Sequence, residues 1–338
     1  MLSRVASSLY WLGRYIERAE NVARFIDVNR HLMLDLPTGA REQWEPLVTT
    51  TGDDAAFRLR YGAATRESVT QFLTFDRWNP NSVLSAMTAA RENARSVREI
   101  IPSEMWEHIN RAYFFVKEAS ESRGTLETPH EFYAEIKLRS HLVAGVTDAT
   151  MSHGEAWHIL RMGRLLERAD QTSRIIDVKY YVMLPTVDDV GTPFDKLHWT
   201  ALLKSASALQ MYRQRYGRIA PRGVAEFLIL NREFPRALHY CIIKTEESVH
   251  AIVGSSPGTF RNPAQQHLGR LRAELNYADI SELIQAGLHE AMDTFQGRIN
   301  EIGDAIFETF FALKQARNAP PLPQAVAVTK PELVPCEA

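Results

Sequence analysis

The chain has 338 residues, 45% of them hydrophobic and 24% charged, a composition typical of a globular protein with a sizeable core. Its net charge of −2 and pI near 6.6 argue against a general binder of nucleic acid or of anionic membranes. The two cysteines, Cys241 and Cys336, are too few for a disulfide framework and too far apart for a CxxC site, so we expect a reduced, cytoplasmic setting. The N-terminus does not read as a secretory signal and no run approaches 18 apolar residues, so we expect no membrane-spanning helix.

The N-terminal segment predicts a long amphipathic helix. Its apolar residues gather on one side of a helical wheel, and the strict alternation of a strand is absent. Ser7 or Ser8 is a candidate N-cap for this helix, and a start several residues earlier is the alternative. The sequence Leu36-Pro37-Thr38-Gly39 then predicts a loop, because proline and glycine favour turns.

Further helices are separated by glycine, proline or polar stretches. Gly62 suits a helix C-cap, Pro80 suits the first turn of a helix, and residues 121 to 129 form a polar loop. The expected helices run from Trp44 to Gly62, around Val69 to Leu73, from Pro80 to about Ile100, from Ser103 to Ser120 and from His130 to Met151.

One stretch of the chain occurs twice. The segment Gly13 to Leu34 returns as Gly163 to Leu184, 150 residues further on and without a gap. Eleven of the 22 positions are identical, and Glu20 keeps its carboxylate as Asp170. The identical pairs are Gly13/Gly163, Arg14/Arg164, Glu17/Glu167, Arg18/Arg168, Ala19/Ala169, Arg24/Arg174, Ile26/Ile176, Asp27/Asp177, Val28/Val178, Met33/Met183 and Leu34/Leu184.

Similarity continues beyond this stretch, displaced by 155 residues because the loop from Pro185 to His198 is longer. The later pairs include Trp44/Trp199, Arg60/Arg215, Phe72/Phe227, Leu73/Leu228 and Arg77/Arg232. A repeat this long is not a solenoid period, so duplication and fusion describe it better. We predict an all-α, internally duplicated helical bundle with two pseudo-symmetric halves, residues 1–150 and 151–317, followed by a flexible Pro-rich tail at 318–338.

The repeated helix keeps its charged side and changes its apolar side. Five repeated charged positions fall within one polar sector at about 100° per residue, and Arg18 sits just beyond its edge. Intrahelical salt bridges on an exposed face contribute only about 0.2 to 0.5 kcal/mol each, too little to hold residue identity. Two interpretations remain open. The face is a buried ionic network, whose pairs cost about 3 to 5 kcal/mol to break, or it binds a charged ligand or partner.

The arginines of the later repeated segment allow two roles as well. Arg60, Arg77 and their copies stand beside helix ends, where cations satisfy terminal carbonyls, and we favour that role slightly over binding of a carboxylate or phosphate. Trp44, Phe72 and their copies are expected in the core. The candidate ligand-binding or partner-binding residues are therefore Arg14, Glu17, Arg18, Glu20, Arg24, Asp27, Arg60, Arg77, Arg164, Glu167, Arg168, Asp170, Arg174, Asp177, Arg215 and Arg232.

Motifs of known catalytic sites are absent: the sequence has no P-loop, no Rossmann glycine pattern, no HExxH and no G-x-S-x-G. Two E-x-x-H spacings, Glu155/His158 and Glu247/His250, resemble half of a di-iron carboxylate bundle. They fall at positions that do not repeat, so a di-metal bundle is only a minor alternative, and we expect no metal or cofactor.

Glu17-Arg18 and Glu167-Arg168, each within the pattern G-R-x-x-E-R-A, resemble the motif of the bacterial alpha-E family, also called DUF403. The resemblance covers nearly everything up to about residue 317 and implies an all-helical tandem duplication with a recurrent ER motif. It implies partners too, because such proteins are encoded beside circularly permuted ATP-grasp ligase-like proteins and transglutaminase-like peptidases. The setting implied is a peptide synthesis or modification system, and the resemblance assigns no catalytic residue.

Two functions from different classes follow. The first is an accessory helical protein that binds the ATP-grasp ligase-like or transglutaminase-like partner, or its peptide substrate. The second is an enzyme acting on peptides or amino acids, with the repeated Glu and Arg residues as acid, base and carboxylate clamp. The enzyme requires a cavity where Glu17 or Glu167 meets Arg60, Arg77 or their copies.

Overall fold

The computed structural model describes residues 1–35, 43–122, 129–181 and 193–312. In these segments the chain forms fifteen α-helices and a short π-helical turn, with no strand in the part described, which confirms the all-α prediction. The helices are α1 (Ser3–Asp35), α2 (Glu45–Thr51), α3 (Asp54–Tyr61), α4 (Arg66–Thr74), α5 (Val83–Ser96), α6 (Ser103–Glu121), α7 (Pro129–Thr150), α8 (Glu155–Tyr181), α9 (Pro193–Ser205), α10 (Leu209–Tyr216), α11 (Pro221–Leu230), α12 (Leu238–Val253), α13 (Pro263–Tyr277), α14 (Ile280–Ala286) and α15 (Leu288–Ile306), and the turn is η2 (Phe307–Phe311).

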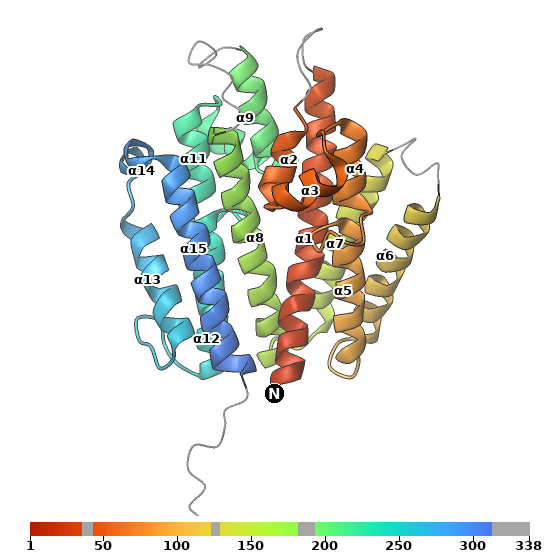
Figure 1. Cartoon of the computed structure of the whole chain (residues 1–338). Coiled ribbons are helices and arrows are strands. Elements are labelled where there is room, and N and C mark those ends of the chain that lie inside the picture. The colour runs from red at the N-terminus through yellow and green to blue at the C-terminus, as the bar shows by residue number, and fades with distance from the viewer. Residues whose placement is uncertain (36–42, 123–128, 182–192, 313–338) are drawn as a thin grey trace, which may run out of the picture.

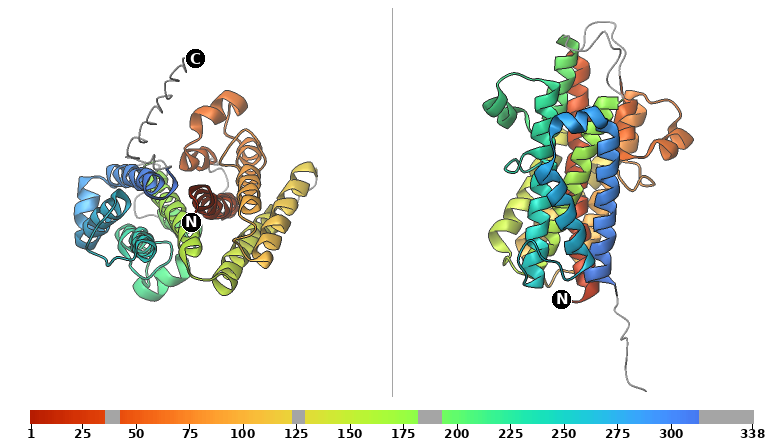
Figure 2. Two further views of the ribbon diagram at one scale, coloured as in Figure 1. Left: turned by 90° about the horizontal axis from the view of Figure 1, so that it is seen from below. Right: turned by 90° about the vertical axis from the view of Figure 1, so that its left-hand side faces the viewer.

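Two long helices form the centre of the molecule. α1 and α8 lie side by side and run in the same direction, with α4 to α7 on the side of α1 and α10 to α15 on the side of α8 (Figures 1 and 2). α2 packs mainly on α8, and α9 packs mainly on α1. With 33 and 27 residues they are roughly 50 and 40 Å long. The two copies of the repeated stretch therefore face one another.

The hydrophobic core crosses from one side of the chain to the other. The larger of two clusters joins Leu9 and Leu12 of α1 to Leu166 of α8, and reaches Met105 of α6 and Ile299 of α15. The second cluster lies between α1 and helices α2 to α7. Trp44, Phe72 and Leu73 and their copies Trp199, Phe227 and Leu228 are all buried, as predicted.

The repeated glycines allow α1 and α8 to touch. A Cβ atom at Gly13 would overlap the carbonyl oxygen of Leu160, and one at Gly163 would overlap the carbonyl oxygen of Tyr10. Only glycine permits two helix backbones to come this close, since every other residue carries the Cβ. The close approach brings the charged side chains one turn further along within reach of the opposite helix.

α1 begins at Ser3, which agrees with the alternative of a start several residues before Ser7. Four other expected boundaries were wrong, for local reasons. The helix expected from Trp44 to Gly62 is two helices, because Gly52 takes a left-handed conformation with φ of 76° and ends α2. α5 begins after Ser82, whose hydroxyl accepts a hydrogen bond from the amide of Ser85, and it ends at Ser96 rather than near Ile100.

The fourth boundary lies in the expected loop from Pro185 to His198, because α9 already begins at Pro193. The rest of that loop, the segment Leu36 to Gly39, most of the polar loop before Pro129, and the tail with Cys336 fall outside the described residues. None of the described helices combines the length and the apolar character needed to span a membrane.

Candidate functional site: a crossed ion network between two helices

The ER motifs of the two copies pair with each other. Arg168 of α8 donates from Nε and Nη2 to the two carboxylate oxygens of Glu17 on α1, both at 2.8 Å. In the reverse direction, Arg18 donates from Nε and Nη2 to Glu167, at 2.7 and 2.9 Å. Each pair has the two parallel hydrogen bonds that make arginine–carboxylate contacts strong. The two glutamates are 5% and 0% exposed, which agrees with the first of the two interpretations, a buried ionic network.

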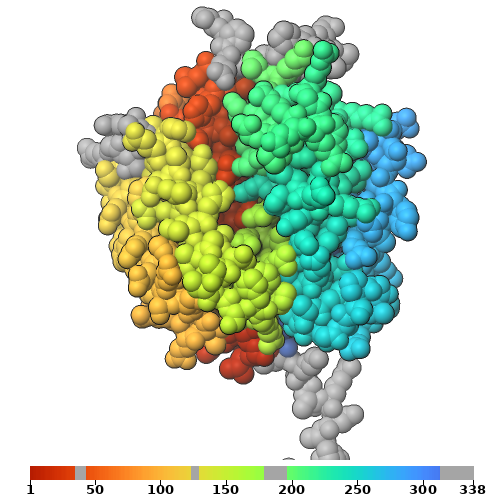
Figure 3. Space-filling view, turned by 180° about the vertical axis from the view of Figure 1, so that it is seen from behind, coloured from red at the N-terminus to blue at the C-terminus, as the bar shows by residue number. Residues whose placement is uncertain are grey.

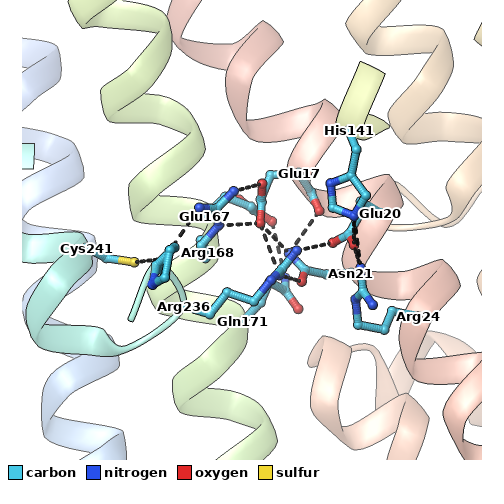
Figure 4. Close-up of polar contacts among 11 residues, drawn as sticks. Glu17, Glu20, Asn21, Arg24, His141, Glu167, Arg168, Gln171, Arg236 and Cys241 are labelled. Carbon is cyan, nitrogen blue, oxygen red and sulfur yellow. Dashed lines mark hydrogen bonds and ion pairs between the residues drawn. The ribbon is translucent and has the colours of Figure 1, made fainter. Parts of the chain in front are cut away.

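Each of the two carboxylates accepts further hydrogen bonds from other side chains. Glu167 accepts a hydrogen bond from Arg14 Nε at 2.8 Å and one from Gln171 at 3.2 Å. Glu17 accepts one from Asn21 at 3.4 Å and one from Arg236 Nη1 at 3.3 Å. Figure 4 shows this second set. Buried carboxylates with this many cationic donors are satisfied members of a network and not exposed reactive groups.

Burial and the neighbouring arginines have opposite effects on the pKa values of both glutamates. Burial alone raises the pKa of Glu17, but Arg168 and Arg236 outweigh it and hold the pKa far below its ordinary value. Burial likewise raises the pKa of Glu167, and Arg18 and Arg14 lower it to about 2. Both groups are therefore ionised at neutral pH.

A second carboxylate lies next to Glu17. Glu20 is 2% exposed, accepts a 2.8 Å hydrogen bond from Arg236 Nη2 and is paired with Arg24. Its copy Asp170 is paired with Arg174 at 2.9 Å. These two i,i+4 pairs are intrahelical salt bridges, whereas Arg14 and Glu17 pair with residues of α8 and not with each other.

The persistent aspartates tie each central helix to a neighbour. Asp27 accepts hydrogen bonds from His130 Nδ1 at 2.8 Å and from Lys137 Nζ at 2.6 Å, both on α7. Asp177 is paired with His289 of α15. Because Asp27 is 4% exposed, a merely solvated charged face is excluded for this part of α1.

The later repeated arginines do not join this network. Arg60 donates to Asp76 at 2.7 Å and to the carbonyl of Trp78, and Arg232 donates to the carbonyl of Asn276 at 3.5 Å. Arg77 and Arg215 are exposed, the latter over the ring of Tyr216. The arginines that meet Glu17 are instead Arg168 and Arg236.

Several network members were not found by the sequence analysis, among them Arg236, Asn21, Gln171 and His141. At a displacement of 155 residues Arg236 matches Asn81, so a search for identical positions passes over it. His141 of α7 lies 3.4 Å from Arg24 Nη2. Burial, Arg24 and Arg236 together lower the pKa of His141 to about 4.

The E-x-x-H pairs do not gather into a metal centre among the described residues. Glu155 contacts the N-terminal ammonium group, and Glu247 contacts Lys244. The group of side chains close enough to share a metal there is Asp27, His31 and His130, whose ligand atoms lie within 4.8 Å of one another. Lys137 already donates a hydrogen bond to the carboxylate of Asp27, and its ammonium group would repel a metal cation bound there.

A small cavity adjoins the Glu17 side. It measures about 30 Å³, and its polar lining includes Glu17, Glu20, His141, Arg164 and Arg168. Figure 3 shows a narrow cleft between α7 and the helices that follow α8 on this face, with α1 visible at its bottom.

The crossed pairs involve the motif by which the chain resembles a known protein family. Residues 1–311 match the model of Alpha-E, described as a predicted alpha-helical domain with a conserved ER motif. The chain belongs to the Alpha-E family. In this Alpha-E protein the two ER motifs are the crossed pairs between α1 and α8.

Relatives of this Alpha-E chain include an uncharacterized protein of Mycobacterium bovis, 23% identical over 342 residues, which cover 92% of this chain and 37% of the relative. An uncharacterized protein of Mycobacterium tuberculosis is 22% identical over the same extents. The chain thus spans little more than a third of the curated relatives it matches. No solved structure matches it.

Proposed function

We propose that this Alpha-E protein is a non-catalytic accessory protein of a peptide synthesis or modification system, and that it binds an ATP-grasp ligase-like or transglutaminase-like partner, or the partner's peptide substrate. The observation that carries the proposal is that both ER carboxylates are occupied by arginines of the opposite helix. The two carboxylates form ion pairs that join the two halves of the chain. We therefore expect the surfaces around them to bind the partner or its substrate.

The enzyme alternative is weaker for the same reason. A general acid or base works best with a pKa near the working pH and needs access to the substrate. Glu17 and Glu167 are buried and have lowered pKa values, and Arg60 and Arg77 do not meet them.

The reciprocal pairs support a duplicated origin for the chain. Glu17 with Arg168 and Glu167 with Arg18 are the same contact with the copies exchanged. The pairs Asp27 with His130 and Asp177 with His289 repeat in the same way. We infer that the two halves pack about a pseudo-two-fold axis between α1 and α8, by analogy with the isologous interface of a homodimer.

A binding and activity experiment tests the function. The Alpha-E protein is mixed in turn with the ATP-grasp ligase-like protein and with the transglutaminase-like protein, each purified separately, and each mixture is passed through a size-exclusion column. The turnover of each partner is measured with and without the Alpha-E protein. We expect a joint peak or a change in turnover. Separate peaks together with unchanged turnover for both partner types would refute the accessory role, and peptide turnover by the Alpha-E protein alone that disappears in Glu17→Gln would favour the enzyme.

A further inference from the structure

The crossed network has two carboxylate clusters of unequal charge. The Glu167 cluster contains the cations Arg14, Arg18 and Arg174 and the carboxylates Glu167, Asp170 and Asp53. The Glu17 cluster contains the cations Arg24, Arg164, Arg168 and Arg236 and the carboxylates Glu17 and Glu20. The first is balanced, whereas the second carries two surplus positive charges.

Two substitutions between the copies produce this difference. In the first copy, Asn81 accepts a hydrogen bond from Arg18 and donates two to Asp53, the residue before α3. The corresponding residues are Arg236 and Ala208, the latter before α10 and 0% exposed. Each exchange makes the net charge of the Glu17 cluster one unit more positive, because Arg236 adds a positive charge and Ala208 lacks the negative charge of Asp53.

Other charges nearby do not remove the surplus. Asp148 and Arg161 act on Arg164 in opposite directions, and the side chain of Asp148 is 64% exposed and therefore screened by solvent. Asp27 is already paired with Lys137. The Glu17 cluster is therefore an electropositive site beneath the protein surface.

The surplus leaves hydrogen-bond donors unused. Among the described residues, the buried Nε atoms of Arg24 and Arg164 have no hydrogen-bond partner. Burial and Arg236 lower the pKa of Arg24 to about 9, and burial, against the attraction of Glu17, lowers that of Arg236 to about 10. A buried cation with a lowered pKa and an unused donor is stabilised by an anion placed beside it.

The cavity beside the cluster reaches solvent at His141, on α7, the helix that borders the cleft of Figure 3. His141 has a side chain 59% exposed and lines the cavity of about 30 Å³ together with Arg164 and Arg168. About 10 to 15 Å³ of cavity volume of this kind holds one water, so the cavity has room for about two waters. The space therefore suits the two oxygens of a carboxylate better than the bulkier phosphate group.

We propose that the Glu17 cluster binds a carboxylate of an acidic peptide, which enters between α7 and the helices after α8 and meets Arg164, Arg24 and His141. The ligand class rests on the proposed function, which supplies the peptide. The site itself rests on the charge surplus and the cavity. The Glu167 cluster, whose arginines already have Asp53, is structural.

The test uses hexaglutamate, hexaglutamine and inorganic phosphate as probes, titrated into the purified full chain by calorimetry at low ionic strength. We expect hexaglutamate to bind and hexaglutamine not to bind. Ala208→Asp restores the carboxylate of the first copy as an internal competitor, and Arg236→Asn restores its asparagine. Each variant is expected to weaken binding by at least about tenfold. Arg111→Gln, at an exposed ion pair on α6, is the matched control and is expected to bind like the parent.

A second measurement is made on the unaltered chain and needs one substitution, at the exposed His141, only to assign its signal. Bound carboxylate offsets the repulsion of Arg24 and Arg236, so the pKa of His141, followed by NMR, is expected to rise when hexaglutamate is added; His141→Gln identifies the signal. Equal binding of both peptides, no binding of hexaglutamate, unchanged binding by a folded Ala208→Asp, binding of phosphate alone, or an unchanged His141 pKa would each overturn the proposal. Peptide binding without partner association would support this site and refute the proposed partner. Partner association without peptide binding would support the partner and refute this site.

Discussion

The buried position of Glu17 makes its charge a strong test of the network. Glu17→Gln keeps the size of the side chain but removes the negative charge that Arg168 and Arg236 share. Breaking one buried pair by removing one partner costs about 3 to 5 kcal/mol, because the remaining charge stays buried without compensation. We expect a loss of that order in the free energy of unfolding.

The two glutamates should not respond equally. Glu17→Gln raises the surplus of its cluster from two positive charges to three, whereas Glu167→Gln leaves its cluster with a surplus of one. We therefore expect Glu17→Gln to be the more destabilising of two substitutions that remove the same atoms. Urea unfolding followed by circular dichroism measures both free energies under one condition.

A matched control separates burial from charge. Glu107 pairs with Arg111 on α6, where both side chains are more than half exposed, and Glu107→Gln is expected to cost less than about 1 kcal/mol. The combined change Glu17→Gln with Arg168→Gln should cost less than the sum of the single changes, because the two residues interact directly. A cost below about 1 kcal/mol for Glu17→Gln, or a larger cost for Glu167→Gln, would refute the charge argument.

Two further predictions concern the same pair of helices. Gly163→Ala places a Cβ atom against the carbonyl of Tyr10 and should destabilise the fold by about 1 to 3 kcal/mol, whereas Gly145→Ala in the open interior of α7 should stabilise it slightly; equal thermal shifts would contradict the close approach. The lowered pKa values of Glu17 and Glu167 predict that stability is fully present above the unfolded glutamate pKa and is lost as pH falls from about 4.5 toward 2 and below. Urea unfolding at a series of pH values checks this, and the double Gln variant should lose much of that dependence.

The sequence predicted that the charged face is either buried or occupied by a ligand, because the chain contains its own comparison. Exposed salt bridges contribute too little to preserve residue identity, so the persistence of Glu17 and Arg18 in the copy Glu167 and Arg168 indicated a costly environment. The partner could not be predicted in the same way. Arg14 stands three residues before Glu17 and could pair with it along α1, but in the structure both side chains pair with residues of α8.

The close approach of the two helices explains why Arg14 pairs with a residue of α8. Whether Arg14 turns along its own helix or across to the next depends on the distance between the helix axes, which Gly13 and Gly163 set. Glycine within a helical pattern indicates a special backbone requirement but does not identify the neighbour. The helix boundaries failed on a smaller scale, where Gly52 and Ser82 overrode the apolar periodicity.

Positions that differ between the copies carry the complementary information. Identical residues describe what both halves need in order to fold, and a search restricted to them omits Arg236 because its counterpart is Asn81. Once the crossed pairs are known, differences that change buried charge become the informative ones, since an uncompensated charge is costly unless something binds it. The exchanges of Asn81 for Arg236 and of Asp53 for Ala208 act in the same direction on one cluster. That agreement assigns ligand binding to the Glu17 side, and the Ala208→Asp variant tests it by returning that side to the balance of its counterpart.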